Sequence, residues 1–103
     1  MTESEYQHLA DVTLNYLEAA LDAAGVDYER GTGGVLEIEF EDGSMIVVNK
    51  QAAAQEIWVA AKSGGFHYRW LGAAWCDNRG GEELFAALAR LASAQAGYAV
   101  ELG

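Results

Sequence analysis

Residues 33–68 constrain the fold of this chain more than any other stretch, because their apolar and polar side chains alternate. Between residues 36 and 41 every second residue is apolar and the others are glutamates, which is typical of a strand with one buried and one solvated face. Residues 56–61 keep this period, with Ile57 and Val59 predicted inside and Trp58 outside. The stretch therefore predicts three consecutive antiparallel strands, the last of which carries a large indole on its open face.

The turn at residues 41–44 decides which side chains of the second strand are buried. A two-residue Asp-Gly turn would leave Ile46 and Val48 outside. A type I turn with Gly43 as the bulge residue would place both inside and direct Asn49 outward. We favour the bulge, because it buries the two β-branched residues and leaves the asparagine in water.

Helical periodicity flanks these strands. Residues 4–24 predict an amphipathic helix that begins at Ser4, uses Gln7 in a capping box and ends at Gly25. Its expected core stripe is Leu9, Thr13, Tyr16, Leu17, Ala20 and Ala24. Residues 82–96 predict a second helix, whose expected core face is Leu84, Phe85, Leu88, Leu91 and Ala92. Residues 98–102 either form a last strand or cover the gap between the helices.

Shorter strands complete the expected sheet. Residues 26–30 predict an edge strand, residues 74–76 a short further strand, and residues 66–71 a strand with aromatic side chains inside and His67 and Arg69 on the open face. The order of a helix, a run of strands and a helix, without a linker, predicts one domain over residues 1–103. We expect an α+β, two-layer sandwich, in which one antiparallel sheet of five to seven strands has both helices packed on one face.

Charge is distributed unevenly along the chain. The sequence has 16 acidic and 6 basic residues, for a formal net charge of -10. Residues 1–42 hold 11 of the acids and only one base, Arg30, whereas residues 43–103 hold 5 of each. Such a field repels nucleic acid and anionic membranes and attracts cations and basic protein surfaces. The alternative is that the excess charge serves only solubility.

Two groups of carboxylates could meet at one edge of the molecule. Glu18 and Asp22 are four residues apart on the first helix, close enough to share a hydrated cation, and Asp11 lies about 10 Å further along it. Asp27 and Glu29 share one side of the edge strand, which could bring them beside the helix pair. The alternatives are a solvated helix face and edge charges that discourage aggregation.

Other kinds of site are excluded or lack a motif. The single Cys76 can form no internal disulfide, and without a Cys/His cluster any metal must be held by oxygen. The chain has no phosphate-binding loop, serine elbow or H-E-x-x-H helix, so we expect no enzymatic activity. Since it shows neither a secretory leader nor a long apolar run, we expect a cytoplasmic protein.

Three motifs resemble the frataxin family. They are GGVLEIEFEDGS, NKQ followed by IWVA, and SGGFHYRW, and the segments EYQHLAD and CDNRGGEELF resemble its bacterial members. The resemblance implies a frataxin-like fold that binds iron (Fe2+ or Fe3+) weakly, without an organic cofactor, and is a monomer without metal. It also implies docking on a cysteine desulfurase and on the iron–sulfur scaffold protein, whose assembly of clusters it would regulate.

Site residues follow from this resemblance by position. The iron-binding acidic ridge would be Asp11, Glu18, Asp22, Asp27 and Glu29. The partner-binding docking face would be Asn49, Gln51, Glu56, Trp58 and His67. One alternative is a pure docking module whose acids meet a basic partner without a physiological metal. Another is a ferroxidase or iron-storage protein, which we rank low because no preorganised di-iron site can be found in these residues.

Overall fold

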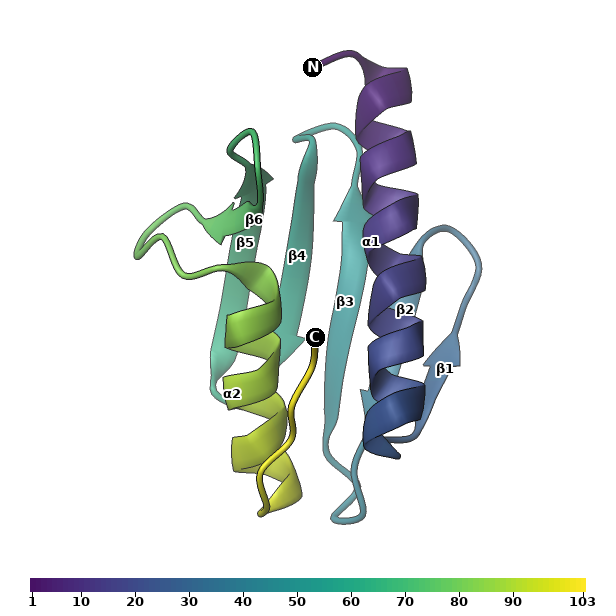
Figure 1. Cartoon of the computed structure of the whole chain (residues 1–103), viewed down its shortest axis with the longest axis vertical. Coiled ribbons are helices and arrows are strands. Elements are labelled where there is room, and N and C mark those ends of the chain that lie inside the picture. The colour runs from purple at the N-terminus through teal and green to yellow at the C-terminus, as the bar shows by residue number, and fades with distance from the viewer.

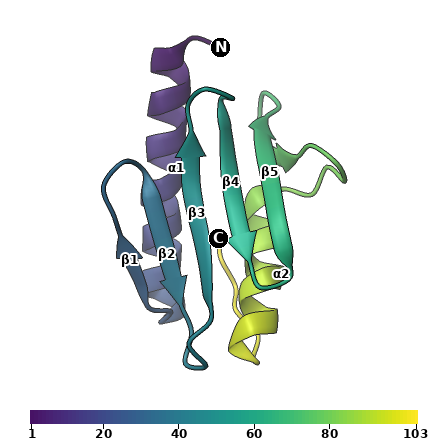
Figure 2. The ribbon, with the colours of Figure 1, turned by 180° about the vertical axis from the view of Figure 1, so that it is seen from behind.

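The computed structural model describes residues 1–103 and consists of eight elements in two layers. They are α1 (Glu3–Ala24), β1 (Tyr28–Arg30), β2 (Val35–Glu39), β3 (Met45–Gln51), β4 (Glu56–Ala61), β5 (Gly64–Trp70), β6 (Trp75–Asp77) and α2 (Leu84–Ala96). The six strands form one antiparallel sheet in the order of the sequence. Both helices cover the same face of the sheet (Figure 1), and the other face, here called the open face, is uncovered (Figure 2). The predicted α+β sandwich is therefore confirmed.

The β2–β3 hairpin fixes which side chains face the helices. Gly43 has a φ of 86°, a left-handed conformation that favours glycine, and the Phe40 amide donates to the Ser44 carbonyl across the turn at 3.0 Å. Ile38 lies opposite Ile46 in this register, and both side chains are buried. The predicted bulge is therefore confirmed, and it directs Asn49 to the open face.

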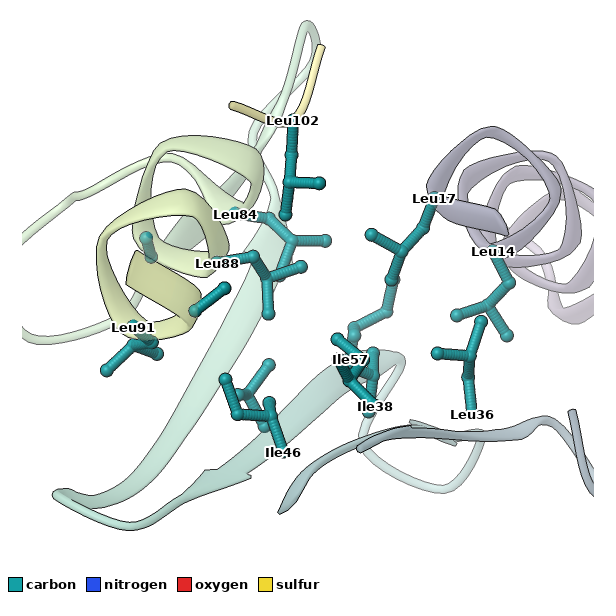
Figure 3. Packing of buried hydrophobic residues seen from close by; sticks show 14 of the residues in the cluster. Leu14, Leu17, Leu36, Ile38, Ile46, Ile57, Leu84, Leu88, Leu91 and Leu102 are labelled. Carbon is teal, nitrogen blue, oxygen red and sulfur yellow. The ribbon is translucent and has the colours of Figure 1, made fainter. Parts of the chain in front are cut away.

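The core lies between the sheet and the two helices. Leucines of α1 and α2 point toward isoleucines and a leucine of the sheet, and Leu102 closes the layer from the C-terminal tail (Figure 3). Two long-range hydrogen bonds cross this layer. The Tyr6 hydroxyl donates to the Glu56 carbonyl at 2.7 Å, and the Trp75 indole donates to the Thr13 hydroxyl at 2.9 Å. They tie α1 to β4 and β6.

The predicted phase and start of α1 are both wrong. The buried residues of this helix are Tyr6, Ala10, Thr13, Leu14, Leu17 and Leu21, a stripe turned by roughly 60° from the expected one at 100° per residue. Tyr16 is exposed and packs edge-on against Phe85 of α2, while Leu9 is only half-buried. The N-cap is Thr2 rather than Ser4, because Thr2 and Glu5 form the capping box that was expected for Ser4 and Gln7.

The C-terminal part differs from expectation in its details. Helix α2 begins at Leu84, with Glu83 as the N-cap, and it buries Ala87 where Phe85 was expected. The tail forms no strand. It runs between the helices (Figure 1), with Val100 and Leu102 buried, so the second of the two alternatives for residues 98–102 is correct. The boundaries of β1, β5 and β6 also shift by one or two residues from those expected.

Tyr68 carries the one buried side-chain polar atom without a hydrogen-bond partner, its hydroxyl. We expect Tyr68→Phe to raise the free energy of unfolding at pH 7 by about 1 kcal/mol, because the substitution removes an unsatisfied buried group. Tyr6→Phe is the matched control, and it should lower stability by about 1 kcal/mol, because its hydroxyl is bonded to Glu56. Urea denaturation measures both; lower stability of Tyr68→Phe would contradict this expectation.

The same tyrosine gives stability a dependence on alkaline pH. Burial raises the pKa of Tyr68 to about 12. Between pH 10 and 12 the unfolded chain therefore loses a proton that the folded chain keeps, so the contribution of this group is complete below pH 10 and falls as the pH rises. The stability difference between Tyr68→Phe and the parent protein should thus grow over this interval in favour of the variant.

Candidate functional site

The predicted docking face forms two rows across the open face. In the first row, Asn49 of β3 lies opposite Trp58 of β4, which lies opposite His67 of β5. The Trp58 and His67 rings are stacked, with centroids 4.2 Å apart and planes inclined by 7°. Because cross-strand neighbours share one face of a sheet, these three side chains form a continuous patch, with no element packed over it (Figure 2).

The second row lies beside the first and consists of Gln51, Glu56 and Arg69. Glu56 was predicted as a partner-binding residue, but only 6% of its side chain is accessible. One carboxylate oxygen accepts the Trp58 indole N–H at 2.8 Å, and the other accepts from Arg69 at 3.0 Å. The His67 Nδ1 atom lies 3.8 Å from the first oxygen. Glu56 is therefore a buried support of the docking face rather than an exposed contact.

Three carboxylates of α1, those of Asp11, Glu18 and Asp22, lie on the flank of the helix that borders the sheet, and the sheet supplies cations to two of them. Lys50 follows the inward alternation of β3, so its ammonium group points toward α1. It lies 2.7 Å from both the Asp11 carboxylate and the Gln7 side-chain oxygen. Asp11, the first residue of the predicted acidic ridge, thus already has a cationic partner within the chain.

A second cation occupies the centre of the ridge. Arg30 of β1 forms an ion pair with Glu18 and donates to the Asn15 side chain at 3.1 Å. The Tyr28 hydroxyl donates to Asp22 at 3.1 Å. Desolvation, together with this hydrogen bond to a carboxylate, raises the pKa of the Tyr28 phenol. Glu18 and Asp22 therefore share a polar network with β1.

The remaining ridge residues do not join this network. Tyr28 and Arg30 of β1 face the helix, so the alternation of the strand directs Glu29 to the open face, where it lies opposite Glu37 of β2. Asp27 precedes the strand, is exposed and has the same parity as Glu29. The alternative in which the edge strand brings its acids beside Glu18 and Asp22 therefore does not hold for Glu29. No three His, Cys, Asp or Glu side chains in the structure are grouped closely enough to hold a metal ion.

Sequence reasoning missed the partners of the acidic and docking residues, namely Arg69, Lys50, Arg30 and Tyr28. A signal was present for two of them. Lys50 and Arg30 stand at inward positions of strands whose neighbours at that spacing are apolar or aromatic. A charged side chain in such a position needs a partner on the facing layer. The acids of α1 on its sheet-facing flank are those partners.

Comparison with known proteins identifies the family. Residues 1–98 match the family model of the frataxin-like domain. The chain belongs to the frataxin-like family. A frataxin-like relative from Dechloromonas aromatica, named iron-sulfur cluster assembly protein CyaY, is 53% identical over 104 residues, which cover 99% of each chain. A relative of the same name from Cupriavidus metallidurans is 54% identical over 107 residues, covering 99% of this chain and 96% of the relative.

Solved structures of frataxins share the fold. The frataxin from Psychromonas ingrahamii has a TM-score of 0.91 at 28% identity and covers 100% of this chain and 99% of its own. The trimeric frataxin from the yeast Saccharomyces cerevisiae, complexed with ferrous iron, has a TM-score of 0.67 at 26% identity, with 94% and 88% coverage. Neither helix of this chain combines the length and apolar character needed to cross a membrane.

Proposed function

We propose that this protein is an iron-binding adaptor that regulates iron–sulfur cluster assembly in the cytoplasm. It docks on the cysteine desulfurase and the scaffold protein through the docking face and carries iron weakly on the acidic ridge. The observation that supports docking most directly is the Trp58–His67 stack on an uncovered sheet face. Aromatic side chains that are rigid and accessible are the usual anchors of protein interfaces. The names of the relatives support cluster assembly as the pathway.

Weak iron binding is what the geometry of the ridge supports. Carboxylate oxygens are hard ligands suited to iron as a hydrated ion. An ion at Glu18 would compete with Arg30, and an ion at Asp11 would compete with Lys50. The internal cation must leave the carboxylate before a metal ion can bind there. This competition lowers the affinity of the ridge for iron. The yeast frataxin solved with ferrous iron supports the choice of metal.

Titration of Fe(II) into ¹⁵N-labelled protein tests the metal half of the proposal. We expect broadening or shifts at Glu18 and Asp22 and weaker changes at Asp27 and Glu29. Arg30→Gln should strengthen binding about three-fold, because it releases the Glu18 carboxylate from a half-buried ion pair. Unchanged spectra at all four acidic residues would contradict iron binding by the ridge.

The regulatory half requires the desulfurase. Its activity is measured with and without iron, in the presence of the parent protein or of a Glu18→Ala/Asp22→Ala variant. The variant should remove the iron-dependent difference. A Glu3→Ala/Glu101→Ala variant is the matched control, because it loses the same charge at two exposed positions away from the ridge network. Equal effects of the two variants would show that only net charge matters.

A second candidate function is a pure docking module that meets a basic partner without a physiological metal. The pairing of Asp11 and Glu18 with internal cations and the absence of a clustered metal site favour it. In both candidates the protein performs no catalytic step of its own. Oxidation of Fe(II) by dioxygen well above the buffer rate would contradict that part of the proposal.

A further inference from the structure

Arg79, in the loop between β6 and α2, differs from every other basic residue of this chain. The sequence has six Lys and Arg residues. The other five each have a carboxylate within 4.0 Å; they are Arg30, Lys50, Lys62, Arg69 and Arg90. In a chain with 16 acidic residues, Arg79 has none. Its guanidinium charge is therefore available to a group from outside.

Arg79 nevertheless has two contacts within the chain. Its Nη2 atom donates to the Gly65 carbonyl at 2.9 Å, and its guanidinium lies 6.0 Å from the centroid of the Phe66 ring. Asp77, the nearest acid along the loop, accepts the Arg79 backbone N–H at 2.7 Å. A guanidinium has five N–H donors, so one bond to a carbonyl leaves most of them free. The side chain thus has a hydrogen-bond partner within the chain and keeps unused donors.

An open cleft of about 480 Å³ lies beside this guanidinium. Its lining consists of Gly65, His67, Asn78 and Arg79, without an apolar side chain or a carboxylate. Two of these four residues, His67 and Arg79, have side chains that can carry a positive charge. Such a cleft suits a small oxyanion, which can take two parallel hydrogen bonds from a guanidinium.

His67 joins this cleft to the docking face, because its ring also stacks on Trp58. The open face as a whole is polarised. Glu29 and Glu37 lie opposite each other on β1 and β2, whereas His67 and Arg69 stand on β5. A partner bound across this face would meet acids at one end and bases at the other.

We propose that the cleft at Arg79 binds the carboxylate of an acidic side chain on the protein that docks on Trp58. This inference rests on the proposed docking function and specifies the chemistry of the partner at one end of the interface. A single carboxylate fits better than a polyanion such as nucleic acid, because the net charge of -10 repels extended anions. At an ionic strength of 0.15 M that distant charge is screened beyond about 8 Å, so the local guanidinium dominates.

Binding of the desulfurase–scaffold complex to Arg79→Gln tests the proposal. We expect about a five-fold loss of affinity relative to the parent protein, because one charge-assisted contact at an exposed site is removed. Arg79→Lys should retain part of the affinity, since it keeps the charge but not the planar fork. Arg90→Gln is the matched control, because Arg90 is exposed and already paired with Glu82, and it should bind normally.

A peptide titration identifies the ligand class. A capped tetrapeptide with two aspartates should shift the amide resonances of Gly65, His67 and Asn78 in the parent protein but not in Arg79→Gln. Its counterpart with two asparagines should shift none of them. Shifts from inorganic phosphate without shifts from the aspartate peptide would overturn the assignment of a carboxylate.

Two variants distinguish failure of the carboxylate cleft from failure of the docking function. Normal binding of the complex by Arg79→Gln, combined with loss of binding by Trp58→Ala, would overturn the carboxylate cleft and leave docking intact. Normal binding by both variants would overturn docking itself. Folding of each variant is checked by its amide spectrum.

Discussion

Trp58→Ala is expected to weaken binding of the desulfurase–scaffold complex by about 30-fold or more. Central aromatic residues of interfaces typically contribute at least about 2 kcal/mol, which corresponds to that factor. The indole is held before binding, because it stacks on His67 and donates to Glu56. Little side-chain entropy would therefore be lost when a partner covers it. Affinity is measured by titration calorimetry against the assembled complex.

The control for this substitution is Tyr98→Ala, which removes an exposed aromatic side chain that is 59% accessible and lies outside the sheet. It should leave affinity unchanged. Iron binding by Trp58→Ala should also be unchanged, because the ridge cations Arg30 and Lys50 face the helix side. Parent-like affinity of Trp58→Ala would contradict the docking face, whereas a parallel loss of iron binding would contradict the separation of the two surfaces.

Glu56→Ala should lower the free energy of unfolding by about 2 kcal/mol. The substitution removes the acceptor of the Trp58 indole and the partner of Arg69. Hydrogen bonds to charged groups typically contribute about 1.5–3 kcal/mol, and the solvent exposure of Arg69 reduces its share. The indole N–H resonance of Trp58 should move toward its solvent-exposed position, and partner affinity should fall as the stack loosens.

Glu56→Gln separates the hydrogen bond from the charge. Its amide oxygen can still accept from Trp58, so the indole resonance should stay near its original position. The stability loss should be smaller than for alanine. If Glu56→Ala unfolds with the parent midpoint and leaves the indole resonance in place, the carboxylate does not support the docking face.

Local sequence chemistry predicted the β2–β3 hairpin correctly, because Gly43 at the bulge position and the β-branched Ile46 and Val48 agree on one register. The same register argument placed Asn49, Trp58 and His67 on one face. The register argument could not predict that Glu56 is buried. Alternation assigns a side chain to a face, but burial on that face depends on the neighbouring side chains, here Trp58 of the same strand and Arg69 of β5.

The buried stripe of α1 and the partners of the ridge acids, in contrast, were not predicted correctly. Because Tyr16 is large and apolar, it was included in the expected core stripe of α1. In the structure it instead packs on Phe85 at the margin of the core. Asp11, Glu18 and Asp22 lie on the flank of α1 beside the sheet. Their pairing with Lys50 and Arg30 depends on the angle at which α1 crosses the strands, which periodicity within one segment cannot determine.

The order of the strands in the sheet determines which contacts contribute most to the entropic cost of folding. Each strand pairs with the next strand in the sequence, so every hairpin closes a short loop. Helix α1 is the exception, since Tyr6 must find Glu56 and Thr13 must find Trp75, across 50 and 62 residues. Contacts of long sequence separation slow folding. The docking face can thus assemble from local hairpins, whereas the core is completed only when α1 closes over it.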